Sequence, residues 1–328
     1  MRHRRIGSTD LVASEVGLAV WPLVAGPQAR SDEQVAGLLG AALDLGIGYF
    51  AATDADDGGR AERLLGAAVR GHRDEVTVAT TFGYDTTPNP WQPAPQPPRH
   101  DWSTAFAGAA LDRSLHRLGL EPIDLWLLHH PGMDAVESDA LFHFLGEQVE
   151  KGKIRHYGVA LGPGAGWGDE GALALRDRRV AAVETVYNLA EQDPGRELAA
   201  MATEVGAGLV VRDPLAPRLP PAARERLGFL TRDRDQTLDQ ALLRFALADP
   251  VVATVLPPVP DQAVLAELAA AADLPPPTAQ DLDLIAELHR ARFGLPERGP
   301  GGAAADGGRA DHGDPRRHRH PDRPGPTR

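Results

Sequence analysis

The chain of 328 residues contains no cysteine, which excludes disulfide frameworks, zinc ribbons and thiol nucleophiles. It also lacks any apolar run close to the ~20 residues that span a bilayer, and its basic start has no apolar core of a signal peptide. We therefore expect a soluble, cytoplasmic protein. Its 46 acidic residues outnumber 34 lysines plus arginines, giving a net charge of -12. This charge argues against nucleic acid or an anionic membrane as a partner.

Lysine is almost absent as well. The only two are Lys151 and Lys153, in an EKGK turn directly before an expected strand. In a barrel of parallel strands, the turns before the strands lie at the opposite end from the loops that carry function. Neither lysine is therefore expected to reach a catalytic site.

Short β-branched apolar runs alternate with amphipathic stretches of helical length, a pattern typical of repeated βα units. The expected strands span residues 15–20, 47–52, 76–82, 123–129, 154–160, 181–187, 208–212 and 252–256. Helices are expected to begin near Asp32, Arg60, Ser103, Ser138, Asp169, Asp193, Gln236 and Asp261. Eight such units favour a closed (β/α)₈ TIM barrel over an open sheet, and the first strand has no GxGxxG after it.

The barrel is expected to occupy residues 1–295, as a single α/β domain. From about Pro296 the chain is rich in Gly, Pro, Arg and His without apolar periodicity, so residues 296–328 are expected to form a disordered tail. His318 and His320 lie in this tail, where no fixed geometry would support metal binding. We therefore expect no metal site.

Function in such a barrel is carried by the loops after the strand C-termini, where a small-molecule substrate is expected. Six prolines stiffen the loop after the third strand, which is expected to form a rim or lid. Trp21, Trp91 and Trp167 lie on or beside these loops and are candidates for lining an apolar substrate pocket, whereas Trp126 falls within the fourth strand and is expected in the core.

Five stretches resemble the aldo-keto reductase family, particularly its bacterial and potassium-channel-β-like branch: RRIGSTDLVASEVGLAVWPL, ALDLGIGYFAATDADDGGRAERLLGAAVRGHRDEVTVATTFG, SLHRLGLEPIDLWLLHHP, VEKGKIRHYGVA and ALLRFALADPVVATVLP. They cover about residues 4 to 290 in the family's order. The resemblance implies a (β/α)₈ barrel that binds NADPH across its mouth and reduces carbonyls. It also implies four catalytic residues: an Asp, a Tyr, a Lys and a His.

The chain departs from this catalytic set. YFAATDADDGG places Ala51 at the position of the Asp and Asp56 at that of the Tyr, and VATTFG places Thr81 at that of the Lys. Only His129, in DLWLLHHP, matches the family.

Two tyrosines follow strands on the functional side, Tyr84 after the third and Tyr187 after the sixth. Either is a candidate proton donor. Without Lys and Asp beside it, each is expected to stay near the reference pKa of about 10, which makes a poor acid.

The positions that the resemblance assigns to the cofactor have also changed. A Ser-Asn pair is replaced by Ala160 and Leu161, a Gln by Glu184, and the aromatic that stacks on the nicotinamide by Arg212. The phosphate-binding run reads PPVPDQAVLAEL, which lacks cations and contains Asp261. We therefore predict that NADPH binding is lost or very weak, and that the protein uses no cofactor.

The remaining polar residues offer acid–base chemistry. His129 ends a strand at the mouth and is the candidate acid or base, and His130 directly after it is a candidate substrate-binding residue. Asp54 or Asp56 could pair with it as a proton-transfer dyad, or belong to a solvated turn.

Arg212 is a candidate anchor for a carboxylate or enolate oxygen. Its alternative is a simple pair with Asp213 at the rim. Glu184 on the sixth strand is expected to contact Arg212 or His129, because burying a carboxylate without a partner is costly.

These observations lead to a redox-inactive homologue as the main prediction. Its chemistry would be a cofactor-independent cyclisation, isomerisation, dehydration or other lyase step on an apolar oxygenated metabolite, in bacterial specialised metabolism. One alternative is an NADPH-dependent carbonyl reductase whose proton donor has moved to Tyr84 or Tyr187. Another is a non-catalytic binding or auxiliary protein.

Overall fold

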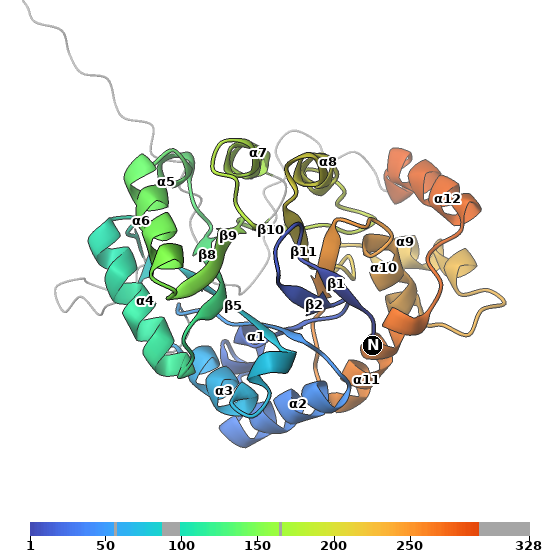
Figure 1. Ribbon diagram of the computed structural model, residues 1–328. Helices are drawn as coiled ribbons and strands as arrows, with labels where there is room; N and C mark the ends of the chain where they lie inside the picture. Colours follow the sequence, from blue (N-terminus) through green and yellow to red (C-terminus); the bar gives the residue numbers. More distant parts are fainter. Residues whose placement is uncertain (56–57, 87–98, 164–165, 295–328) are drawn as a thin grey trace, which may run out of the picture.

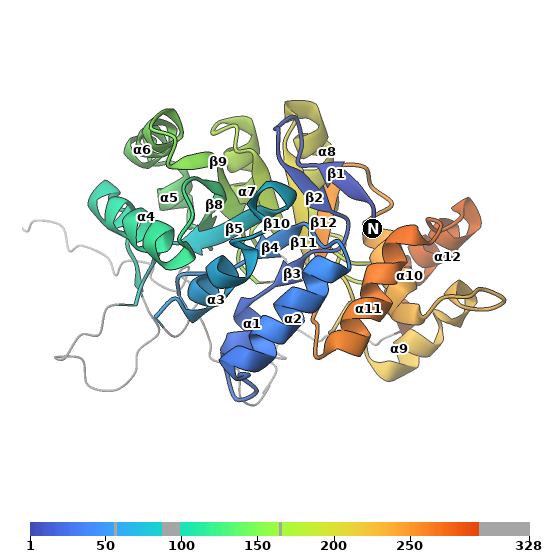
Figure 2. The ribbon, with the colours of Figure 1, turned by 60° about the horizontal axis from the view of Figure 1, so that its bottom comes forward.

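A computed structural model shows the predicted barrel, and it describes residues 1–55, 58–86, 99–163 and 166–294. Eight parallel strands form one sheet in the order β12-β11-β10-β9-β8-β5-β4-β3. Figure 1 shows the helices around these strands, and Figure 2 labels each strand of the order. Val16 bridges Val255 in parallel, which closes the sheet between its two end strands. The strands are β3 (Leu18–Ala19), β4 (Tyr49–Ala51), β5 (Thr77–Phe82), β8 (Ile123–His129), β9 (Ile154–Ala160), β10 (Ala182–Val186), β11 (Gly208–Arg212) and β12 (Val252–Leu256).

Helices surround the strands, and Figure 2 shows α2, α3, α10 and α11 on the outside of the sheet. The longer helices are α2 (Asp32–Asp44), α3 (Arg60–Val69), α4 (Thr104–Leu118), α6 (Asp139–Glu150), α7 (Gly168–Arg176), α8 (Gly195–Val205), α10 (Leu238–Ala246), α11 (Gln262–Ala270) and α12 (Ala279–Arg290). Shorter ones are α1 (Trp21–Val24), α5 (Met133–Val136), α9 (Pro221–Glu225), η1 (Arg73–Glu75), η2 (Gly228–Leu230), η3 (Ala271–Asp273) and η4 (Arg292–Gly294). Among the described helices, none is long and apolar enough to cross a membrane.

Side-chain caps explain where several helices begin. Ser31, Ser103, Ser138, Thr237 and Asp261 each accept a hydrogen bond from the backbone N–H three residues later. Such caps satisfy amides that have no partner within the helix. For this reason, the helix starts predicted from Ser and Asp lie within two or three residues of the observed ones.

The core has two parts. Small and aliphatic residues fill the barrel interior together with Tyr49, whose side chain is fully buried. A larger cluster lies between the sheet and the helices. Trp126 belongs to it, fully buried and stacked on Phe82 with ring centroids 3.7 Å apart, as predicted for a core residue.

An N-terminal hairpin that the sequence analysis did not predict lies across the end of the barrel opposite the functional loops. Its strands are β1 (His3–Arg5) and β2 (Val12–Ser14), in front of the barrel strands in Figure 1. Ile6 and Leu11, on the connecting turn, pack into the interior cluster. The hairpin therefore closes the floor of the barrel.

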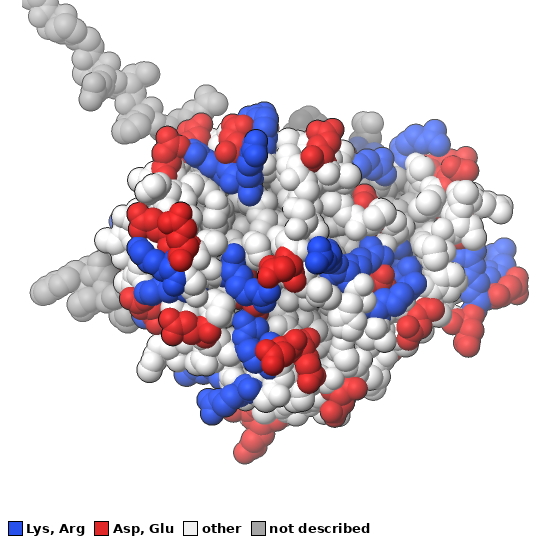
Figure 3. All heavy atoms as spheres, viewed as in Figure 1, with Lys and Arg blue, Asp and Glu red and all other residues white. Residues whose placement is uncertain are grey.

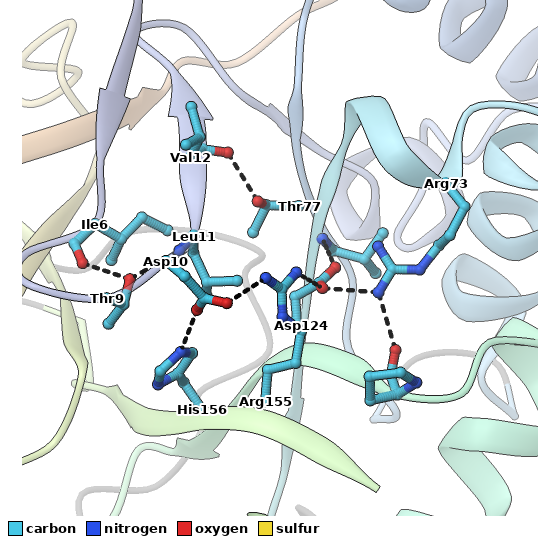
Figure 4. A network of polar contacts seen from close by, with 12 residues as sticks. Ile6, Thr9, Asp10, Leu11, Val12, Arg73, Thr77, Asp124, Arg155 and His156 are labelled. Atoms are coloured by element: carbon cyan, nitrogen blue, oxygen red, sulfur yellow. Dashed lines mark hydrogen bonds and ion pairs between the residues drawn. The ribbon is translucent and has the colours of Figure 1, made fainter. Parts of the chain in front are cut away.

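Polar contacts reinforce this floor (Figure 4). The buried carboxylate of Asp124 accepts from Arg73 at 2.7 Å, from Arg155 at 2.8 Å and from the Val78 N–H at 2.8 Å. Arg155 continues to Asp10 at 2.7 Å, which links β9 to the hairpin. Figure 3 shows basic and acidic side chains interspersed over the same face of the molecule.

Both lysines lie at this end of the barrel, ahead of β9, as predicted. Lys151 pairs with Glu147 at 2.8 Å, and Lys153 pairs with Asp112 at 2.7 Å. Neither is near the C-terminal end of β5, where the family carries its lysine.

Candidate active site

His129 ends β8 at the barrel mouth, and two threonine hydroxyls surround one of its ring nitrogens. Thr81 Oγ1, on the neighbouring strand β5, lies 3.2 Å from His129 Nδ1. Thr53 Oγ1 lies 2.9 Å from Thr81 Oγ1 and 3.5 Å from the same nitrogen. The hydroxyl of Thr81, at the position of the family's lysine, thus orients the imidazole. Sequence reasoning missed Thr53, because its position after a strand does not show which side chains of the neighbouring strands it contacts.

Tyr84 packs against this histidine. It lies in β6 (Tyr84–Asp85), which pairs with β7 (Arg99–His100). Its ring stands almost perpendicular to that of His129, with centroids 4.9 Å apart, and the His100 ring lies 4.0 Å away. Burial raises the pKa of Tyr84 to about 12, so the expectation that it stays near 10 is wrong.

His130 meets the phenol of Tyr84 directly, with Nδ1 2.9 Å from the hydroxyl oxygen. Its backbone is left-handed, with φ 54°, and its N–H donates to the carbonyl of Ala160 at 2.8 Å. Histidine is among the few non-glycine residues enriched in this conformation. The turn brings two consecutive imidazoles to the same tyrosine, their centroids 4.3 Å apart.

Tyr187 lies elsewhere. Its ring packs 5.9 Å from that of Phe245 in α10 and belongs to the cluster between the sheet and the helices. The pKa of Tyr187 is raised as well, and burial is the largest cause. Of the two candidate donors, the structure therefore brings only Tyr84 to His129.

The tryptophans divide in the same way. Trp21 is partly exposed and packs on the interior cluster, on the side of the mouth. Trp167 is 8% exposed and covers Gly162, so it contributes mainly to the outer core, although its ring lies 6.3 Å from that of His130. Trp91 and Asp56 lie outside the described residues, as do the histidines of the tail.

Asp54 does not form the predicted dyad with His129. The residue is 5% exposed, and its Oδ1 has no hydrogen-bond partner among the described residues. The charges that act on it belong to Glu62 in α3 and to Arg113 and Arg117 in α4, on the outer side of the strands. Burial first, and then the charge of Glu62, raise the pKa of Asp54 to about 8.

This pKa predicts a pH-dependent gain from the substitution Asp54→Asn. Folded Asp54 keeps its proton up to about pH 8, whereas the unfolded chain releases it near pH 4. Because the folded state binds more protons between these values, Asp54 lowers the free energy of unfolding progressively as the pH rises from 4 to 8. Asp54→Asn should therefore stabilise the protein little at pH 4 and increasingly as the pH rises to 8. Urea unfolding at several pH values tests this, and a gain that is constant with pH contradicts it.

Arg212 and Glu184 form the ion pair that was expected of them. Arg212 Nε lies 3.0 Å from Glu184 Oε1, and its Nη2 donates to the carbonyl of Leu161. Burial raises the pKa of Glu184, and the guanidinium opposes this rise. Among the described residues, Arg212 pairs with Glu184 and not with Asp213, so the alternative pairing at the rim is not formed. The pair is neutral overall, so Arg212 does not present an uncompensated positive charge at the mouth.

The first turn of α11 follows the run that corresponds to the family's phosphate site. Asp261 caps it by accepting from the Val264 N–H at 2.9 Å. Arg30, in the loop between α1 and α2, donates from Nη2 to the carbonyl of Pro260. The fold thus brings a cation to a run that contains none. Sequence reasoning missed it because the two residues are 230 positions apart.

Comparisons with known proteins agree with this architecture. A D-threo-aldose 1-dehydrogenase from Pseudomonas sp is 30% identical over 230 residues, which cover 62% of this chain and 69% of the relative. An uncharacterised oxidoreductase of Bacillus subtilis is 32% identical over 160 residues, 49% of each chain, so this chain spans about half the length of that relative. The solved holo form of an aldo-keto reductase from Bacillus halodurans is 25% identical with a TM-score of 0.74, covering 88% of this chain and 96% of the other.

These relatives contradict the prediction of a redox-inactive lyase, isomerase or cyclase. They are named as an oxidoreductase, a dehydrogenase and a reductase. The prediction was wrong because it inferred the loss of redox chemistry from replaced motif positions, Ala51 and Thr81 among them, whereas the relatives are named for redox reactions. The sequence model of the family described as "Aldo/keto reductase family" matches residues 16–290, which form most of the described barrel. The chain therefore belongs to the aldo-keto reductase family.

Proposed function

We propose that this protein is an oxidoreductase that reduces the carbonyl group of a small molecule, using a nicotinamide nucleotide. The observation that carries the proposal is the packing of Tyr84, in β6 just after β5, against His129 at the end of β8. Relatives named 6-dehydroglucose reductase, from Novosphingobium aromaticivorans, and D-threo-aldose 1-dehydrogenase favour oxidised sugars as the substrate class. We place the reaction in the cytoplasm, where reduced nicotinamide nucleotide is available.

Two features of the mouth fit such a nucleotide. The buried ion pair between Arg212 and Glu184 is neutral, so it removes the charge repulsion expected between Arg212 and an oxidised nicotinamide ring. Arg30 offers a guanidinium beside the first turn of α11, where it would hold a phosphate group. When bound, the nucleotide supplies the hydride for the carbonyl carbon.

The protein's own residues then handle the carbonyl oxygen. Thr81 and Thr53 hold His129 through Nδ1, and this histidine would orient the carbonyl. Tyr84 would give its proton to the alkoxide that forms. Protonation by a positioned side chain contributes about 10²–10⁴-fold to a rate.

The direct test combines binding and turnover. The purified protein is titrated with NADPH and with NADH while tryptophan fluorescence is recorded, and their oxidation is then followed with a panel of aldoses, aldehydes and ketones. The proposal predicts saturable binding and oxidation that depends on the carbonyl compound. A flat titration with both nucleotides, together with no oxidation, would overturn it.

Arg30 provides a prediction specific to the nucleotide. Replacing it by glutamine removes one charge-assisted hydrogen bond, so the Kd for NADPH should rise about tenfold, which corresponds to ~1.4 kcal/mol. Arg63, whose guanidinium donates to the Gly58 carbonyl, is the control, and Arg63→Gln should leave the Kd unchanged. Equal Kd values for Arg30→Gln and the wild type, measured by fluorescence, would exclude Arg30 from the site.

A further inference from the structure

We propose that His130 is a positioning residue that takes over the task of the absent lysine. Its Nδ1–H would donate to the phenol oxygen of Tyr84 and stabilise the phenolate left when Tyr84 protonates the product. This inference rests on the proposed reductase function and adds a residue that the family's four-residue set does not contain.

The contact is close and well defined. The phenol oxygen of Tyr84 lies 2.9 Å from His130 Nδ1, and the two rings stand at 86° to each other. Tyr84 is 7% exposed and His130 is 8% exposed, so both groups are shielded from solvent. In such surroundings a hydrogen bond to a charged group is stronger than in water.

The backbone holds His130 in place. Its φ of 54° and the hydrogen bond from its N–H to Ala160 fix the direction in which the side chain leaves the strand end. Histidine is one of the few non-glycine residues that adopt this conformation readily, and here it directs the imidazole toward the phenol of Tyr84.

The electrostatics show why Tyr84 needs this partner. Burial raises the pKa of Tyr84 to about 12, which weakens it as a proton donor at neutral pH. Among the described residues, three titratable side chains make ring contacts with Tyr84, and all are imidazoles: His100 at 4.0 Å, His129 at 4.9 Å and His130 at 5.9 Å between centroids. A donor at the phenol oxygen favours the ionised form and so counteracts burial.

The proton balance of the step is simple. Hydride addition forms a C–H bond at the carbonyl carbon, with the reduced nicotinamide nucleotide of the proposed function as the reductant. The O–H bond of Tyr84 breaks as the O–H bond of the alcohol forms. The resulting phenolate accepts the hydrogen bond from His130 Nδ1–H until it recovers a proton from water.

Two substitutions of nearly equal size separate this role from a structural one. His130→Asn and His130→Asp place residues that both tolerate a positive φ. The asparagine amide retains an N–H donor, whereas the aspartate carboxylate has none and adds negative charge. The pKa of Tyr84 is read from the ultraviolet absorbance of its phenolate, by subtracting the titration of Tyr84→Phe from that of the protein with Tyr84 present.

We expect His130→Asp to raise the pKa of Tyr84 further and to lower kcat about 10²-fold, with little change in the KM for NADPH. We expect His130→Asn to keep kcat within about tenfold of the wild type. If His130→Asp fails to fold, His130→Gly also accepts a positive φ and removes the donor.

Identical phenol titrations for the wild type, His130→Asn and His130→Asp would overturn the role of His130. The failure of the reductase function has a different signature. The phenol titrations would then respond as expected, while the wild-type protein neither binds nor oxidises NADPH.

Discussion

Tyr84→Phe is expected to lower kcat for carbonyl reduction by about 10²–10⁴-fold, the usual contribution of a general acid. Phenylalanine retains the ring that packs 4.9 Å from His129, but it has no proton to give to the alkoxide. The nucleotide contacts proposed for Arg30 are unaffected, so the Kd for NADPH should stay the same. Steady-state kinetics and fluorescence titration on the same preparation measure the two quantities.

The matched control is Tyr187→Phe. It removes the same hydroxyl from a tyrosine packed on Phe245, behind the sheet, so kcat should remain near that of the wild type. The opposite result, a large loss with Tyr187→Phe and none with Tyr84→Phe, would move the proton donor to the other tyrosine.

The second large effect is on stability. Asp124→Ala should lower the free energy of unfolding by about 3 kcal/mol, because it removes the buried carboxylate that two guanidinium groups and a buried N–H share as an acceptor. Arg73 and Arg155 are partly exposed, with side chains 26% and 35% accessible, so we place the loss at the lower end of the range for broken buried pairs. Urea unfolding at neutral pH measures this loss.

Asp10→Ala is the control for this floor network. Asp10 is also bonded to Arg155, but its side chain is 64% exposed, and exposed pairs contribute about 0–1 kcal/mol. The hairpin that it holds should therefore remain in place. If both alanine variants unfold at the same urea concentration as the wild type, the barrel floor does not depend on Asp124.

Much of the fold was predictable because local patterns determine it. The strands ending at His129 and Ala160 have the predicted bounds, since apolar runs bounded by turn residues leave little choice. Ser103 and Ser138 lie at the helix starts for the chemical reason that their hydroxyls accept from first-turn amides. The hairpin strands were missed because each has only three residues, too few for an alternating pattern to be recognised.

The site was harder to predict because its contacts join distant residues. Tyr84 and His130 are 46 positions apart, and their contact depends on the left-handed backbone of His130, which the sequence does not predict. The pair of Glu184 and Arg212 was foreseen from the cost of burying a carboxylate. The side on which the Asp54 side chain lies was not foreseen. A residue at a strand end faces either the mouth or the surrounding helices, and the sequence alone does not distinguish the two.

The most direct test of the central claim is to follow the hydride itself. NADPH deuterated at the transferable position is incubated with the protein and an aldose or aldehyde that supports oxidation, and the product is analysed by mass spectrometry. Carbonyl reduction predicts one deuterium on the former carbonyl carbon, and almost none in the same time with Tyr84→Phe. An alcohol without deuterium, or a product of unchanged oxidation state, would contradict the account.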